Sequence, residues 1–310
     1  FSKYQQINNL EKLKKSLQEF NNIDCIQNEK LLFLSRLSFR NKEYQNAKKL
    51  IDSISSEWIE KSNSTQYSIF WNYKGFIEDK IGNFDIAYSC FKKSQEDPAY
   101  SRFSKDSFLN YINNYTESIN RKKTISNKIS YEIQDYDLAF LVGFPRSGTT
   151  LLDTILRSHR DIEVIEEKPI TSSIERLIKK KLNIKIENIF MISEENKIIL
   201  RQHYLKLLNS YKNKNASLII DKLPLNTVCI PLINLLFPKA KIIFAHRHPY
   251  DTVLSCFQQT FKPNEAMANL VSLKSSSIIY DQVMNAWDIY KKNLSFDFIT
   301  SKYELLIENF

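Results

Sequence analysis

The stretch Leu138-Ala-Phe-Leu-Val-Gly143-Phe-Pro-Arg146-Ser-Gly148-Thr-Thr-Leu-Leu-Asp-Thr-Ile-Leu156 decides the fold class. It opens with a continuous apolar run of strand length, which is typical of a strand buried on both faces of a parallel sheet. The residues after Gly148 have the apolar spacing of a helix. A strand, a loop bounded by glycines and a helix together direct free backbone N–H groups and the positive helix end at a phosphate. The predicted phosphate-binding residues are Arg146, Ser147, Gly148, Thr149 and Thr150.

Glycine is scarce in this chain, so its positions are informative. Average usage would give about 22 glycines, whereas the sequence has 4, of which Gly143 and Gly148 bound this loop. Their spacing equals that of the nucleotide P-loop, but Thr149 stands where the P-loop has its lysine. That lysine contacts the β and γ phosphates of a nucleoside triphosphate, so its absence disfavours an ATPase or kinase. Arg146 supplies a cation inside the loop instead.

The composition is that of a globular protein with one large domain or two ordinary ones. The chain has 310 residues, of which 43% are hydrophobic and 25% charged, and no run approaches the roughly 18 apolar residues of a membrane span. A net charge of +9 suits an anionic ligand, yet without an Arg-rich arm or zinc spacing it does not predict nucleic-acid binding. The four cysteines are far apart, which predicts free thiols in the cytoplasm and neither a disulfide frame nor a metal site.

Residues 1–130 are predicted to form an all-α domain, and residues 131–310 the α/β domain. One segment resembles a tetratricopeptide repeat, a pair of helices that packs small residues against aromatic ones. An earlier copy places Ala47 and Ala87 in equivalent positions 40 residues apart, with a longer loop expected at residues 60–65. Such repeats bind peptides or brace a neighbouring domain, and an irregular helical bundle is the alternative. The segment contains Trp71, Gly75, Gly82, Phe84, Ala87, Phe91 and Pro98.

Other apolar runs also end in charged residues. Arg247 closes a predicted strand at residues 241–246, and Lys222 ends another at residues 217–221. Ligands of open parallel sheets bind at this carboxyl edge. Pro249 suits the first turn of a following helix, whose predicted core stripe is Tyr250, Val253, Leu254 and Phe257, leaving Ser255 on the polar face.

Two motifs resemble those of sulfotransferases that use 3′-phosphoadenosine 5′-phosphosulfate. Phe144-Pro-Arg-Ser-Gly-Thr-Thr-Leu151 is similar to the family's 5′-phosphosulfate loop. Lys241-Ile-Ile-Phe-Ala-His-Arg247, with Ser255 eight residues after the arginine, is similar to its 3′-phosphate motif. The resemblance covers residues 137–310 and implies a P-loop-type three-layer α/β/α fold around a parallel sheet. Fusion to helical repeats is also similar to bacterial-type members.

The resemblance implies roles for further residues. Glu166-Glu167 resembles the pair in protein-tyrosine sulfotransferases whose second glutamate is the catalytic base, which indicates Glu167, with Glu166 as the alternate. Lys222 corresponds to the lysine that stabilises the transferred group. Tyr303-Glu-Leu-Leu-Ile307 resembles the family segment whose tyrosine approaches the 3′-phosphate. No histidine matches the base of the small-molecule sulfotransferases.

The sequence therefore predicts sulfuryl transfer to a hydroxyl without a metal, with adenosine 3′,5′-bisphosphate as the product. The expected acceptor is a peptide or protein tyrosine, a glycan or a small molecule, and the repeats could hold a peptide or protein. A P-loop phosphotransferase and a non-catalytic repeat scaffold are the alternatives. The family continues with a segment that closes over the nucleotide, whereas this chain ends at Phe310. We therefore expect either a truncated chain or a missing part that is disordered and lies outside the numbering.

Overall fold

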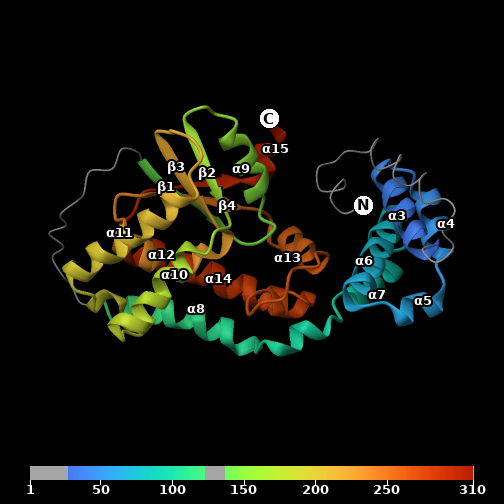
Figure 1. Cartoon of the computed structure of the whole chain (residues 1–310), viewed down its shortest axis with the longest axis horizontal. Helices are drawn as coiled ribbons and strands as arrows, with labels where there is room; N and C mark the ends of the chain where they lie inside the picture. Colours follow the sequence, from blue (N-terminus) through green and yellow to red (C-terminus); the bar gives the residue numbers. More distant parts are fainter. Residues whose placement is uncertain (1–26, 123–136, 310) are drawn as a thin grey trace. The chain divides into compact units, whose positions relative to one another are not determined.

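The computed structural model describes residues 27–122 and 137–309 (Figure 1). They form two compact units. The helical unit contains the described residues up to Arg102 together with Gln258–Lys262, and the α/β unit contains the others. The predicted combination of an all-α part and a parallel α/β part is confirmed. The predicted domain boundary at residue 130 lies outside the described residues.

In the helical unit, α3 packs on α4 and α6 packs on α7. Asn63 caps the start of α6 by accepting a hydrogen bond from the backbone N–H of Gln66. The same helix ends at Gly82, whose φ of 93° is a left-handed conformation that glycine adopts without strain. The elements are α3 (Gln27–Arg40), α4 (Tyr44–Asp52), α5 (Ser56–Lys61), α6 (Ser64–Ile81), α7 (Phe84–Ser94) and the short η2 (Pro98–Arg102).

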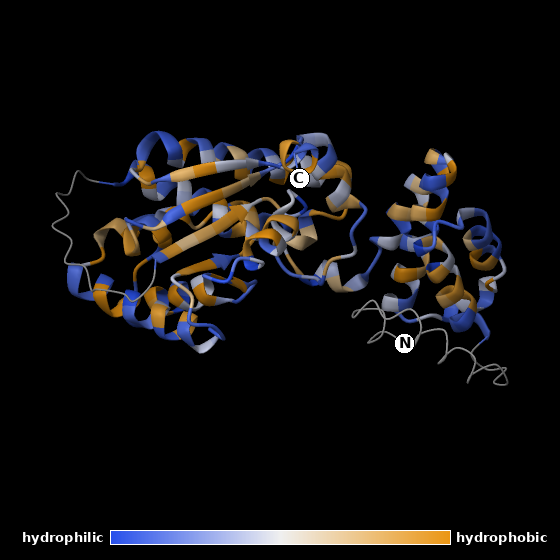
Figure 2. Cartoon of the chain, turned by 90° about the horizontal axis from the view of Figure 1, so that it is seen from above, coloured by the Kyte–Doolittle hydropathy of each residue, from blue (hydrophilic) through white to orange (hydrophobic). Residues whose placement is uncertain are grey.

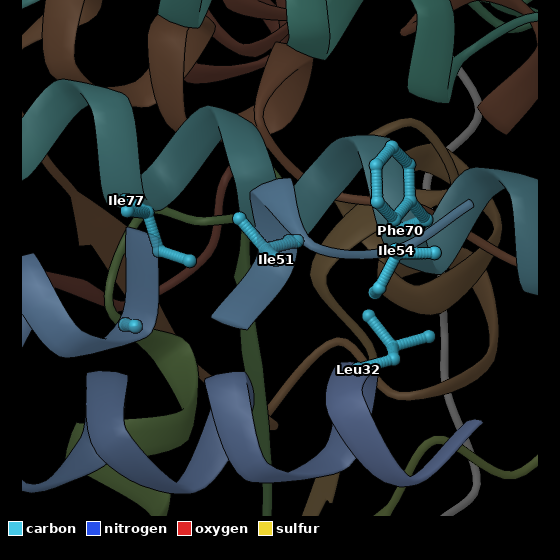
Figure 3. Close-up of a cluster of buried hydrophobic side chains, with 6 residues drawn as sticks. Leu32, Ile51, Ile54, Phe70 and Ile77 are labelled. Carbon is cyan, nitrogen blue, oxygen red and sulfur yellow. The ribbon is translucent and has the colours of Figure 1, made fainter. Parts of the chain in front are cut away.

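Apolar side chains from α3, α4 and α6 form the core of this unit. Figure 3 shows Leu32, Ile51 and Phe70 among the side chains of this cluster. Between α6 and α7 the backbones approach closely, because a Cβ atom on Gly75 would lie 2.8 Å from the ring of Phe91. The predicted loop at residues 60–65 is wrong, since α5 and the start of α6 fill most of it. The assignment to tetratricopeptide repeats stays a prediction.

The α/β unit is built on a parallel sheet with the strand order β2-β3-β1-β4-β5. Strands β1, β3 and β4 were predicted from the sequence, with ends that differ by at most one residue. Since β1 lies between β3 and β4 in the centre, its apolar run is buried over six of its seven residues. The strands are β1 (Asp137–Gly143), β2 (Ile162–Glu166), β3 (Leu218–Lys222), β4 (Lys241–His246) and β5 (Phe298–Lys302).

Helices cover both faces of this sheet. On one face Leu152 of α9 and Leu306 of α15 join a cluster with Leu141 of β1. On the other face Phe140 packs against aromatic rings of α11 and the turn after α12. The helices are α8 (Lys105–Asn120), α9 (Thr149–Arg157), α10 (Ile170–Leu177), α11 (Glu194–Ser210), α12 (Ile230–Leu236), α13 (Pro249–Phe257), α14 (Leu273–Asn293) and α15 (Tyr303–Glu308). Short turns of helix are η3 (Ile178–Leu182), η4 (Ile186–Met191), η5 (Pro224–Thr227) and η6 (Met267–Asn269).

Hydrophobic residues are concentrated in the strands and on one side of most helices (Figure 2). This is the pattern of a sheet enclosed by amphipathic helices. Within residues 27–122 and 137–309, no helix is long and apolar enough to cross a membrane.

Helix α8 belongs to the α/β unit because it shares a buried polar cluster with α10. Tyr111 and Tyr115 of α8 donate hydrogen bonds of 2.6 and 2.5 Å to Oε1 of Glu175 on α10. Burial raises the pKa of Glu175, and the two hydroxyls supply the partners that a buried carboxyl needs. The cluster thereby fixes α10, the helix that follows the Glu166-Glu167 pair.

A second buried carboxyl gives the unit a pH-dependent stability. Burial raises the pKa of Asp221 from 3.8 to about 7, although Tyr204 donates a hydrogen bond to it. The folded protein therefore keeps a proton that the unfolded chain releases over this range. We expect the free energy of unfolding to fall by on the order of 4 kcal/mol as the pH rises through that range. Asp221→Asn should flatten this slope in urea unfolding at several pH values, and an unchanged slope would contradict the assignment.

Candidate functional site

The candidate site lies at the carboxyl edge of the sheet, where β1 and β4 are neighbours. From the central β1 the chain first builds β2 and β3 on one side, and then β4 and β5 on the other. Ligands of open α/β sheets bind in the crevice at such a switch point. The glycine loop, residues 143–149, starts here and leads into α9.

The glycine loop contains polar groups that have no partner among the described residues. Arg146 and Gly148 have φ angles of 68° and 94°, so both occupy the left-handed region that non-glycine residues rarely adopt. Within residues 27–122 and 137–309, no side chain caps the N-terminus of α9, and the buried Oγ of Ser147 has no hydrogen-bond partner. Thr149 is buried and Thr150 is exposed in the first turn of α9. Uncapped N–H groups, a free hydroxyl and a cation together suit a bound anion.

Two arginines from different strand ends meet at this loop. Nε of Arg146 donates to Oγ of Ser255 on α13 at 3.1 Å. Nη1 of Arg247 donates to the backbone oxygen of Arg146 at 3.3 Å, while its buried Nε has no partner in the described part of the chain. The structure therefore brings together Arg146, Arg247 and Ser255, which lie up to 109 residues apart in the chain.

Tyr303, at the start of α15, packs against the same loop. A Cβ atom on Gly148 would lie 2.5 Å from Cδ2 of the tyrosine ring, so only glycine fits there. The guanidinium of Arg247 lies 4.8 Å from the centre of that ring, within cation–π distance. Glu304 holds α15 in place, because it accepts a hydrogen bond from the backbone N–H of His248 at 2.8 Å. This bond lowers the pKa of Glu304.

The predicted core stripe of α13 needs correction. Tyr250 is 82% exposed and Leu254 is 44% exposed, whereas Thr252, Cys256 and Phe257 are buried. The buried side is turned toward the glycine loop, since Sγ of Cys256 donates to the backbone oxygen of Pro145 at 3.3 Å. The prediction is confirmed for Phe257 and wrong for Tyr250 and Leu254, because the face of α13 that carries Cys256 packs against the glycine loop.

A buried lysine at the end of β3 is hydrogen-bonded to two carboxylates at the end of the neighbouring β2. Lys222, which ends β3, has a fully buried side chain. Its Nζ donates to Glu166 at 2.9 Å and to Glu167 at 3.0 Å. The hydrogen bond from Lys222 lowers the pKa of Glu166. The two glutamates have side chains that are 47% and 55% exposed, so they are open to a ligand from solvent.

The backbone of Glu167 is also fixed, by a hydrogen bond to the backbone of Lys222. Its φ angle is 49°, and its N–H donates to the backbone oxygen of Lys222 at 2.7 Å. Arg146 and Glu167 are thus two of the four non-glycine residues with positive φ among those described, the others being Lys42 and Asn183. Strained backbone that the surroundings enforce is concentrated at functional sites in proteins.

The family model for the sulfotransferase family matches residues 139–309, more than half of the chain. The chain belongs to the sulfotransferase family. All the predicted site residues, from Arg146 to Tyr303, lie within the matched part, so the sulfotransferase domain contains both the glycine loop and the Lys222 cluster.

Two further similarities were found. An uncharacterized protein of Aquifex aeolicus (strain VF5) is 36% identical over 129 residues, which are 39% of this chain and 17% of that protein. The match therefore spans less than a fifth of the relative's length. The crystal structure of sulfotransferase STF9 from Mycobacterium avium aligns with a TM-score of 0.33 and 13% identity, covering 84% of this chain and 78% of that chain.

Sequence reasoning missed two residues of the candidate site. Asp153 of α9 lies 3.9 Å from Nζ of Lys222 and forms two hydrogen bonds of 2.6 Å with Arg157. Arg157 also lies 3.5 Å from Glu166. Asp153 and Arg157 are four residues apart, which is the spacing of an ordinary ion pair on a helix. This spacing alone does not indicate a functional site. The burial of Asp153 follows from its place next to β3, which the sequence does not show.

Metal ligands form no candidate site in the sulfotransferase domain as described. Within residues 27–122 and 137–309, no group of three or more His, Cys, Asp or Glu residues is placed to hold a metal ion. His246 is half-buried at the end of β4, and this burial lowers its pKa.

Proposed function

We propose that this domain transfers a sulfuryl group from 3′-phosphoadenosine 5′-phosphosulfate to a hydroxyl group, with a protein tyrosine as the favoured acceptor. One observation carries the proposal: the donor-site residues predicted from separate motifs converge on one loop. Arg146, Arg247 and Ser255 are linked by hydrogen bonds of 3.1 and 3.3 Å. The product would be adenosine 3′,5′-bisphosphate.

The unpaired polar groups of the site suit a donor with two phosphate ends. Ser147 Oγ and the uncapped start of α9 would receive the 5′-phosphosulfate. Ser255 and Arg247, whose Nε has no partner among the residues that the structure describes, would receive the 3′-phosphate. The threonine at position 149 leaves the loop without the lysine that triphosphate enzymes use, which supports a sulfated donor over ATP.

The Lys222 cluster supports the chemistry on the acceptor side. When bound, the donor supplies the sulfuryl group, and its bridging oxygen takes the electron pair of the broken S–O bond. Glu167 is the proposed base that takes the proton of the acceptor hydroxyl as its oxygen bonds to sulfur. Lys222 and Arg146 are cations beside the place where negative charge would gather. The half-exposed Glu167 can reach an acceptor from solvent, whereas Lys222 is enclosed.

Calorimetric titration with adenosine 3′,5′-bisphosphate tests the proposed donor, with ATP and magnesium as the comparison. We expect binding of the bisphosphate and none of ATP, because two separate phosphate sites are proposed and the triphosphate lysine is replaced. Binding of ATP alone would favour a P-loop phosphotransferase. Binding of neither would favour a scaffold without transferase activity.

Arg247→Ala should weaken the bisphosphate much more than adenosine 5′-phosphate. Truncating an arginine that grips a phosphate costs at least roughly 2 kcal/mol, or about 30-fold in the dissociation constant. The analogue without a 3′-phosphate has no such contact to lose. The same titration measures both constants, and an equal loss for the two nucleotides would remove Arg247 from the 3′-phosphate site.

Three further points are proposals: the class of acceptor, peptide binding by the helical unit and the location of the protein in the cell. A glycan or a small hydroxylated molecule would use the same base and cations as a tyrosine, so an acceptor screen must include all three classes. Peptide binding by the helical repeats and a cytoplasmic location stay predictions.

A further inference from the structure

A short segment after α13 joins the helical unit although its neighbours in the chain do not. Residues Gln258–Lys262, which we name the crossing segment, belong to the helical unit, while Phe257 and Pro263 belong to the α/β unit. The chain therefore passes between the two units at three peptide links, one after Arg102 and one at each end of the crossing segment. A domain joined by a single linker would have only the first of these.

Three side chains of the helical unit hold the backbone of the crossing segment. Asn72 of α6 donates to the carbonyl oxygen of Gln258 at 2.7 Å. Gln95, which follows α7, donates to the carbonyl oxygen of Gln259 at 3.1 Å. Tyr100 of η2 donates to the carbonyl oxygen of Phe261 at 2.7 Å. All three donors are buried, and they come from three different elements.

These bonds matter because the segment lacks regular structure of its own. Residues 260–264 belong to neither a helix nor a strand. Fixing an irregular backbone costs conformational entropy, and buried hydrogen bonds to its carbonyl oxygens offset part of that cost. The three donors therefore favour one conformation of the segment. Their loss would leave the chain after α13 free to move.

The crossing segment begins where the proposed donor site ends. Ser255, the partner of Arg146, lies three residues before Gln258 in the sequence. Cys256 contacts Pro145 of the glycine loop from the same turn. Helix ends fray within their last turn unless something holds them. In α13 that last turn carries both contacts with the glycine loop, and the crossing segment follows it immediately.

We propose that Asn72, Gln95 and Tyr100 are positioning residues for α13, through which the helical unit sets the affinity of the donor site for a 3′-phosphorylated nucleotide. This inference rests on the proposed function. By holding the crossing segment they keep the last turn of α13 formed, and with it Ser255 against Arg146. Coupling of this kind is reciprocal, so a nucleotide bound at α13 must also protect the crossing segment.

The test compares the triple variant Asn72→Ala, Gln95→Ala, Tyr100→Phe with Ser35→Ala in the full chain. Ser35 is a matched control, since its buried hydroxyl also donates to a backbone oxygen of the helical unit, that of Ala47, at 2.8 Å. Hydrogen exchange is followed for the crossing segment and α13 without ligand. Titrations use adenosine 3′,5′-bisphosphate and adenosine 5′-phosphate.

We expect faster exchange in the crossing segment and in the last turn of α13 for the triple variant. We also expect its dissociation constant for the bisphosphate to rise by about 5-fold or more, with a smaller rise for adenosine 5′-phosphate, and no change in Ser35→Ala. A merely structural role would weaken both nucleotides alike. An unchanged affinity despite faster exchange, equal losses for both nucleotides, or unchanged exchange would each overturn the inference.

A second variant and a second readout cover a folding failure of the triple variant and a lack of bisphosphate binding by the wild-type protein. If the triple variant does not fold, Tyr100→Phe alone removes one hydroxyl at nearly constant shape and is judged by the same criteria. If the wild-type protein binds no bisphosphate, the proposed function fails by itself. The coupling is then decided by exchange in α13, where faster exchange in the triple variant supports positioning by the helical unit and an unchanged rate overturns it.

Discussion

Glu167→Gln should lower the turnover number by about 10²–10⁴-fold and leave the affinity for adenosine 3′,5′-bisphosphate unchanged. Glutamine keeps the size of the side chain and its hydrogen bond from Lys222, but it cannot take a proton from the acceptor. The backbone conformation is also retained, since the N–H of Glu167 is bonded to the oxygen of Lys222 at 2.7 Å. Initial rates with radiolabelled donor, on an acceptor that the wild-type protein turns over, measure the effect.

Glu166→Gln is the matched control, because both glutamates accept hydrogen bonds from Lys222. Glu166 also lies 3.5 Å from Arg157, so its carboxylate is engaged by two cations and is less free to act as a base. We expect a smaller loss of turnover for this variant than for Glu167→Gln. If Glu166→Gln were the more damaging change, Glu166 would be the base, and equal activity of Glu167→Gln and wild type would exclude Glu167.

The strands and the glycine loop could be predicted because local sequence determines them. The apolar run of β1 is long enough for a strand and too short for a helix. It ends at Gly143, and Gly148 follows five residues later, so two of the chain's four glycines bound the loop. Gly148 is needed at its position for two reasons, a φ of 94° and the ring of Tyr303 above it. Both requirements place a glycine at position 148, and this glycine stands out in a sequence that has only four.

The grouping of Arg247 and Lys222 at one edge could also be predicted, because parallel strands end at the same side of a sheet. The orientation of α13 could not. Its apolar residues Tyr250 and Leu254 are exposed, and no periodicity argument can show which face of a helix a loop will cover. The contacts of the crossing segment could not be predicted from the sequence either, since its hydrogen bonds join residues that are 161 to 186 positions apart.

Lys222→Met should lower the turnover number by about 10²–10³-fold, the loss typical of one preorganised group that stabilises developing charge. Methionine retains most of the buried apolar stem of the side chain, so the core around β3 keeps its volume. We expect stability to fall by less than the about 3–5 kcal/mol of a broken buried ion pair. The reason is that Glu166 and Glu167 are half-exposed and can be solvated, while Asp153 keeps its bonds with Arg157.

Two measurements separate the catalytic role of Lys222 from a structural one. Lys197→Met is the matched control, because Lys197 of α11 is also a buried lysine and is paired with Glu194 at 2.6 Å. We expect it to lose stability without the large loss of turnover. Removing Lys222 also removes the hydrogen bond that lowers the pKa of Glu166, so this carboxyl should titrate at a higher pH when followed by NMR. Near-normal turnover in Lys222→Met would show that Arg146 and the loop suffice for the developing charge, and Lys222 would then serve only to hold the two glutamates.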